Sequence, residues 1–159
     1  MVFIEDREGI FDASIDKVWR LAQAHATEGS KIHPGTTNIV TEMLSENTFV
    51  NSWEQEMKGQ MIRIKTKGTI FYPLGIAFEI MEGPFAGSKY FIYYIPREDG
   101  KTNVVAAGDF RSSFAEPSVG ENEGVGGGGD EDEAALKSMV LSTFEKVFEE
   151  DCEYLKNIE

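Results

Sequence analysis

Two histidines are the side chains of this sequence best suited to move a proton near neutral pH. His25 and His33 are the only imidazoles in the chain, and imidazole titrates closer to pH 7 than any other unperturbed side chain. His33 precedes Pro34-Gly35, which favours the end of a helix or a turn. The sequence offers it no orienting partner. A surface or capping role for His33 is therefore favoured, with catalysis as the alternative.

Asp109 is the second candidate for acid–base chemistry. It follows an apolar run and lies two residues before Arg111, which predicts a carboxylate at or near the inner surface of the last strand. Burying such a group unpaired costs about 1–3 kcal/mol or more, so a pair with Arg111, a tyrosine or a ligand is expected. A structural pair is favoured. In a functional site, the hydroxyls of Tyr90, Tyr93 and Tyr94 could orient an oxygen of a bound molecule.

Hydrophobic periodicity indicates the elements that must position these groups. Residues 2–11 favour a strand, and Ser14 is a candidate N-cap for a helix with an apolar stripe. Residues 24–33 favour a second short helix. From 36 to 114, six runs of β-branched and aromatic residues are separated by turn signals, which predicts an antiparallel meander. The expected fold class is therefore α+β.

One hairpin of this meander can be predicted residue by residue. If Lys58-Gly59 forms a two-residue turn, Trp53 lies opposite Ile64 and Glu54 lies opposite Arg63. One face of the hairpin is then apolar and the other is charged. We therefore expect the sheet to be covered on one side and solvated on the other.

A long amphipathic helix is expected at the C-terminal end. Its apolar stripe consists of Leu136, Met139, Val140, Phe144, Val147, Phe148, Leu155 and Ile158. At about 26 residues it would span roughly 39 Å and must cross several strands. Before it, residues 115–130 are rich in glycine and acids, which predicts a flexible loop that is either a lid or a simple linker. The acids beside the glycine run disfavour a phosphate site there.

Composition argues against several classes of protein. The net charge of -13 repels phosphate backbones and anionic lipids, so neither nucleic-acid binding nor stable membrane association is expected. Cys152 is the only cysteine, which rules out an intrachain disulfide and a cysteine-cluster zinc site. Early charges argue against a signal peptide, and no run reaches about 18 apolar residues. We expect a cytoplasmic protein.

The order strand, two short helices, six strands and long helix resembles the START-like superfamily, also called SRPBCC or helix-grip. The segment Phe11-Asp-Ala-Ser-Ile-Asp-Lys-Val-Trp19 is similar to the entry of that family into its first helix. The turns at Pro73-Leu-Gly75 and Gly83–Gly87 fit its later strands. The resemblance covers residues 1–159 as one domain. It implies a seven-stranded curved antiparallel sheet with two short N-terminal helices, gripping the long C-terminal helix around a deep cavity.

The resemblance also implies a class of ligand for that cavity, without identifying the ligand. The expected ligand is an apolar small molecule, lipid-like or aromatic and polyketide-like, bound without a cofactor or metal. One cysteine and two histidines do not supply a Rieske or iron ligand set. The ligand-binding candidates are Trp53, Ile64, Phe78, Phe91, Tyr93, Asp109, Met139, Phe144, Val147 and Phe148. Plain core packing would select the same helix residues.

Two other functions stay open, because the fold implies a cavity but does not determine what the cavity binds or whether it catalyses a reaction. One is a cyclase or dehydratase that uses Asp109 or His33 as its proton-transfer group. The other is a protein-binding domain of the chaperone-cofactor kind, in which the acidic loop docks a basic partner.

Overall fold

Seven strands and two helices make up the part of the chain that the computed structural model describes, residues 1–113 and 129–158. In chain order they are β1 (Val2–Phe11), α1 (Ile15–Ile32), β2 (Thr36–Met43), β3 (Thr48–Met57), β4 (Gln60–Phe71), β5 (Gly75–Glu82), β6 (Lys89–Pro96), β7 (Thr102–Phe110) and α2 (Gly129–Leu155). The strands form one antiparallel sheet in the order β1-β7-β6-β5-β4-β3-β2. The α+β class and the meander are confirmed.

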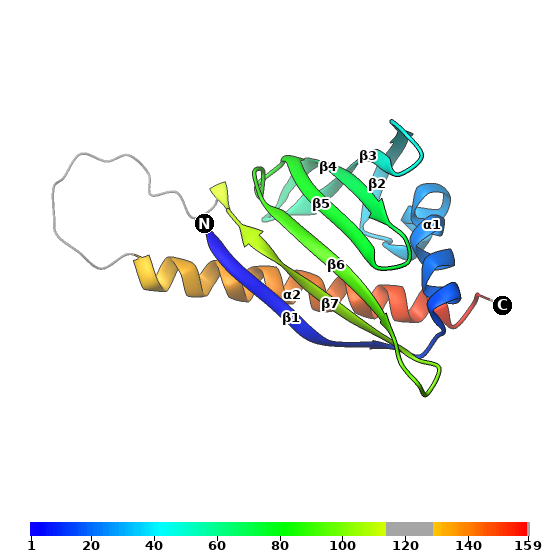
Figure 1. Ribbon diagram of the computed structural model, residues 1–159. Helices are drawn as coiled ribbons and strands as arrows, with labels where there is room; N and C mark the ends of the chain where they lie inside the picture. Colours follow the sequence, from blue (N-terminus) through cyan, green and yellow to red (C-terminus); the bar gives the residue numbers. More distant parts are fainter. Residues whose placement is uncertain (114–128, 159) are drawn as a thin grey trace, which may run out of the picture.

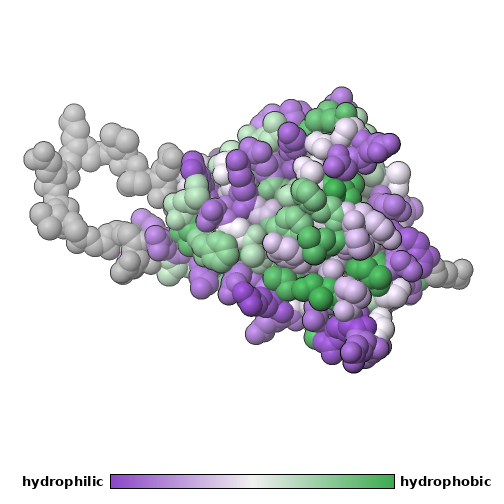
Figure 2. All heavy atoms as spheres, in the orientation of Figure 1, coloured by the Kyte–Doolittle hydropathy of each residue, from purple (hydrophilic) through white to green (hydrophobic). Residues whose placement is uncertain are grey.

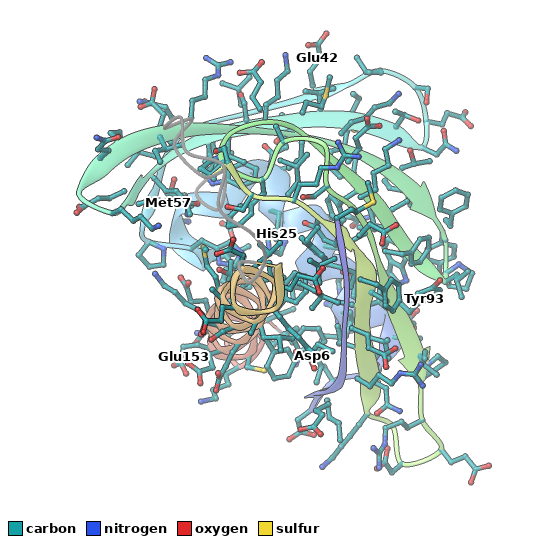
Figure 3. All side chains as sticks on the ribbon, turned by 90° about the vertical axis from the view of Figure 1, so that its left-hand side faces the viewer. Asp6, His25, Glu42, Met57, Tyr93 and Glu153 are labelled. Carbon is teal, nitrogen blue, oxygen red and sulfur yellow. The ribbon has the colours of Figure 1, made fainter. Side chains whose placement is uncertain are left out.

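The long helix α2 runs along one face of the sheet, and α1 lies across one end of it (Figure 1). Seen down its axis, α2 sits under an arch formed by the strands (Figure 3). Its main packing partners are β1 and α1. This is the helix-grip arrangement that the sequence predicted. No helix among the described residues is long and apolar enough to cross a membrane.

The start of α2 differs slightly from the expectation, because the helix begins at Gly129. The rest of the predicted loop, residues 115–128, lies outside the described residues. The interpretations of this loop as a lid, a linker or a docking segment therefore stay predictions.

The N-terminal helix is one element with a kink, so the expectation of two separate short helices was wrong in this detail. Ser14 is the N-cap, and its hydroxyl accepts a hydrogen bond from the backbone N–H of Lys17 at 3.4 Å. At Glu28 the backbone leaves the helical region (φ -125°, ψ 18°), and the helix resumes beyond it. It ends at the C-cap His33, whose N–H donates to the carbonyl of Gly29 at 2.8 Å. The kink changes the direction of the last turn.

The hairpin of β3 and β4 has the predicted register. Trp53 pairs with Ile64 and Glu54 with Arg63, on either side of the Lys58-Gly59 turn. Lys58 and Gly59 both have positive φ, 51° and 78°, as a type I′ turn requires. The Trp53 side of this hairpin faces α2.

Alternation of side chains along the strands separates an inner face, toward α2, from an outer face. The buried core on the inner side falls into two clusters. The first consists of Ile4, Ile64, Ile80, Phe85, Phe110, Leu136 and Val140. The second consists of Phe11, Ala13, Val18, Leu21, Ile32 and Leu155. Partly buried residues pack against both clusters, among them Tyr90 and Phe144 on the first and Tyr94 and Phe148 on the second.

Candidate functional site

The inner face of the sheet carries a set of side chains that are only half-buried although they point inward. We call this set the central inner face, and it consists of Phe49, Asn51, Trp53, Phe78, Tyr90, Ile92 and Tyr94. Across from it, α2 contributes three more half-buried residues, Met139, Phe144 and Phe148. Inward apolar side chains of a filled core are normally fully buried. The central inner face therefore keeps accessible surface that neighbouring side chains do not cover.

Aromatic rings form a continuous series across this face. The ring of Phe49 meets that of Phe78 edge-on, with centroids 6.2 Å apart, and Phe78 stacks on Tyr90 at 5.2 Å. Tyr90 stacks in turn on Phe110 at 5.4 Å and lies 5.8 Å from Phe144 of α2. Separations of this size are typical of favourable ring pairs. The series connects the sheet to the helix and presents flat apolar surface.

Two tyrosines give the central inner face polar atoms. Burial raises the pKa of Tyr90 and of Tyr94 well above the usual value, so both hydroxyls stay protonated and can donate hydrogen bonds. The negative charge of Asp151 on α2 raises the pKa of Tyr94 further. Tyr94 therefore lies within electrostatic range of a charged group on the helix.

That charged group belongs to a cluster of His25, His33 and Asp151, called the His–Asp cluster below. Nε2 of His25 lies 3.1 Å from Nε2 of His33 and 3.2 Å from Oδ1 of Asp151. Nε2 of His33 lies 3.5 Å from the same oxygen. The three side chains are 31, 17 and 14% exposed, respectively. His25 lies between α2 and the arch of the sheet (Figure 3).

The pKa values of the two histidines shift in opposite directions. Burial disfavours the charged form of His25, but the hydrogen bond and the attraction to Asp151, with backbone bonds, outweigh it and raise the pKa of His25. For His33, burial and the repulsion of His25 outweigh the attraction of Asp151 and Glu150, and its pKa is lowered. As the pH falls, His25 is therefore expected to take up its second proton before His33 does.

The kink of α1 brings the two histidines together. Eight residues of straight helix would separate them by about 12 Å along the axis, whereas their ring centroids are 5.1 Å apart. The carboxylate of Glu28, at the kink, accepts a hydrogen bond from the hydroxyl of Tyr154 on α2. This contact ties the bend of α1 to the helix that carries Asp151.

Six of the predicted ligand-binding residues lie on the inner side, namely Trp53, Ile64, Phe78, Met139, Phe144 and Phe148. Ile64 is part of the buried core, and the other five are half-buried. Their role in binding stays a prediction.

The predicted inner position of Asp109 was wrong. It is exposed on the outer face, opposite Lys89 of β6 in the register. Its neighbours Gly108 and Phe110 point inward instead, because side chains alternate along a strand. In this structure Asp109 therefore cannot exchange a proton with a molecule bound on the inner side of the sheet.

Three other candidates also lie away from the central inner face. Phe91 and Tyr93 of β6 point to the outer face, since Tyr90 and Tyr94 occupy the inward positions of that strand. Val147 of α2 is 38% exposed. The residue types of Phe91 and Tyr93 do not distinguish the two faces of a strand, and Val147 was selected from the apolar stripe of the helix.

The outer face is less solvated than expected. Figure 2 looks onto this face and shows apolar residues gathered near its centre. Exposed large apolar residues of the chain include Phe71, Leu74 and Ile95, which are 48, 52 and 43% exposed. A shallow depression of about 390 Å³ is lined there by Lys67, Thr69, Ala77, Phe78, Glu79, Lys89, Tyr90, Phe91 and Ala107. A second, of about 240 Å³, lies over β2 and β3. Both open to solvent, and neither has the enclosed form expected of a ligand cavity.

Sequence reasoning missed Asp151 and the pairing of His25. One signal was available for Asp151, because it follows Phe144 and Phe148 at helical spacing and so places an acid within the apolar stripe of α2. For His25 there was no such signal. The kink of α1 brings its first partner, His33, close to it, and its second partner, Asp151, is 126 positions away in the sequence.

Comparison with known proteins identifies the fold. No family model and no curated protein matches the sequence. Solved structures do match. The Zhui aromatase/cyclase from Streptomyces sp. R1128 superposes with a TM-score of 0.67 at 14% identity, over 97% of this chain and 90% of that one.

Two other similar structures agree. The di-domain ARO/CYC StfQ from the steffimycin biosynthetic pathway gives a TM-score of 0.71 at 15% identity, over 97% of this chain and 50% of that one. A START superfamily protein from Mycobacterium smegmatis gives 0.66 at 11% identity, over 99% of both chains. The chain therefore has the START-like, helix-grip fold.

Proposed function

We propose that this protein binds an apolar small molecule between the central inner face and α2. The observation that carries the proposal is the set of inward aromatic side chains on the central inner face that are only half-buried. Each aromatic ring that a ligand covers removes apolar area from water, worth roughly 25 cal/mol per Å². The hydroxyls of Tyr90 and Tyr94 supply hydrogen-bond donors that would orient the ligand.

The names of two similar structures support aromatic compounds as the first class to test. The proteins from Streptomyces sp. R1128 and from the steffimycin pathway are both described as aromatase/cyclases. A flat, multi-ring molecule would stack well on the series of rings that runs from Phe49 to Phe144.

Binding of the uncharged fluorescent probe N-phenyl-1-naphthylamine tests this proposal with a matched pair of variants. Phe78→Gln changes an inward ring of β5, and Phe91→Gln changes an outward ring of the neighbouring strand. Losing one buried ring contact costs about 1.5–3 kcal/mol, so Phe78→Gln should weaken binding at least about tenfold. Phe91→Gln should leave the affinity nearly unchanged. Equal losses in both variants, or no saturable binding by the wild type, would refute the proposal.

A second candidate function is a proton-transfer enzyme that acts on the bound molecule. It is supported by one observation, the contact of His33 with His25 and Asp151, which gives His33 the partners that the sequence did not reveal. Asp109 has no part in it. This function requires that His33→Gln keep the probe affinity and abolish the conversion of a substrate.

A further inference from the structure

The His–Asp cluster has the composition and spacing of a metal site. Two imidazole nitrogens and one carboxylate oxygen converge from α1 and α2, with separations of 3.1, 3.2 and 3.5 Å. Zinc binds such atoms at about 2.0–2.1 Å in a tetrahedron, whose corners are then roughly 3.3–3.4 Å apart. The observed separations bracket that value. One ion could therefore contact all three atoms with only small side-chain movements.

The orientation of His25 suits a metal ligand. Its Nδ1 lies 2.8 Å from the carbonyl oxygen of Leu21, and it can form this bond only as an N–H donor. In the neutral ring, Nε2 then carries a lone pair directed at the oxygen of Asp151, which also has only lone pairs to offer. Two arrangements remove this conflict, namely a second proton on His25 or a cation between the atoms.

The surroundings of His33 suit a ligand as well. Its Nδ1 is buried and has no hydrogen-bond partner within residues 1–113 and 129–158, and Oε2 of Glu150 lies 3.7 Å from it. When Nε2 of an imidazole binds a metal, its other nitrogen carries the proton and usually donates it to a carboxylate or a carbonyl. Glu150 is placed to accept that hydrogen bond after a small movement.

The end of α2 adds an attraction for cations. Asp151 lies in the last turns of the helix, where the helix dipole is negative, and the last turn of α2 carries no basic residue. The nearby acids Glu149 and Glu150 strengthen this field.

We propose that His25, His33 and Asp151 bind a divalent transition-metal ion of the zinc class, with Glu150 orienting His33. Imidazole and carboxylate ligands suit zinc, cobalt and nickel. Three protein ligands leave a fourth position for water or for an oxygen of a bound molecule, as in catalytic rather than structural zinc sites. The proposal replaces the expectation of a metal-free protein and does not depend on the proposed apolar ligand.

Metal titration of the tag-free chain, after dialysis against a chelator, tests the site directly. Calorimetry with ZnCl₂ should show one ion per chain, and CoCl₂ should give the visible absorption of a four-coordinate ion. Asp151→Asn and His33→Gln should each weaken zinc binding at least about 100-fold, because even partners outside the coordination shell typically contribute 10- to 100-fold. Glu150→Gln should weaken it about tenfold.

The control is Glu153→Gln, an exposed carboxylate on the same helix that pairs with Lys156, which should bind zinc like the wild type. If a ligand variant fails to fold, NMR of the wild type gives the same information. Zinc should then shift the ring-nitrogen signals of both histidines together. No stoichiometric binding, binding that is equal in Asp151→Asn and Glu153→Gln, or histidine signals that zinc leaves unchanged would each overturn the proposal.

Discussion

At the scale of single residues, the charge on each histidine is set by its neighbours rather than by its type. Burial acts against the charge on both rings, yet only His25 has the hydrogen bond to Asp151 that overcomes it. Removing that carboxylate should therefore lower the pKa of His25.

Asp151→Asn tests this in the chelator-treated protein by NMR titration. In the wild type, His25 should titrate above pH 6.5 and His33 below it. In the variant, the pKa of His25 should be lower than in the wild type, since only the backbone hydrogen bonds with Leu21 and Ala22 then oppose the effect of burial. The attraction to Asp151 stabilises the fold fully below pH 6.5 and is lost as the pH rises through the raised pKa of His25. The variant should thus lose more stability at about pH 6 than at about pH 8.5. A loss that grows with pH would contradict this account.

At the scale of elements, the inner rings require close approach of the strand backbone. Tyr90 lies over Gly108 of β7, where a Cβ atom would come within 2.2 Å of the carbonyl oxygen of Lys89 and 2.4 Å of the Cα of Tyr90. These are backbone atoms, so they move only if the strands move. The absence of a side chain at Gly108 therefore allows β6 and β7 to pair as they do.

Gly108→Ala should destabilise the protein by about 1–3 kcal/mol, the usual cost of forcing an extra methyl group into packed structure. Urea unfolding measures this change. Gly35→Ala is the matched control, because no atom lies within 4 Å of a Cβ atom at Gly35, and its effect should stay within about 0.5 kcal/mol. Similar stabilities for the two variants would show that the strands can separate to make room.

At the scale of the whole molecule, the net charge of -13 should select among apolar ligands by their charge. The field of the protein lowers the local concentration of anions, and salt screens this field over a Debye length of about 10 Å at 0.1 M. Apolar contact itself depends much less on salt. The electrostatic and the apolar contributions to binding can therefore be separated with probes that differ in charge.

The anionic probe 8-anilinonaphthalene-1-sulfonate should bind several-fold more tightly at about 300 mM NaCl than at about 20 mM, because screening weakens the repulsion. Fluorescence titration measures this change. The uncharged N-phenyl-1-naphthylamine should change little over the same range. Anion affinity that falls with salt would point to a local basic site that outweighs the overall charge.

The sequence by itself determined the strands, the β3–β4 register and the apolar stripe of α2, because turn chemistry and side-chain periodicity act between near neighbours. Only the tertiary structure decided that Asp109 faces outward, since a shift of one residue reverses the face of a strand. It also decided that His25, His33 and Asp151 meet, because their contact depends on the kink at Glu28 and on the packing of α1 against α2. Such contacts arise from the way whole elements pack, and local sequence patterns do not encode them.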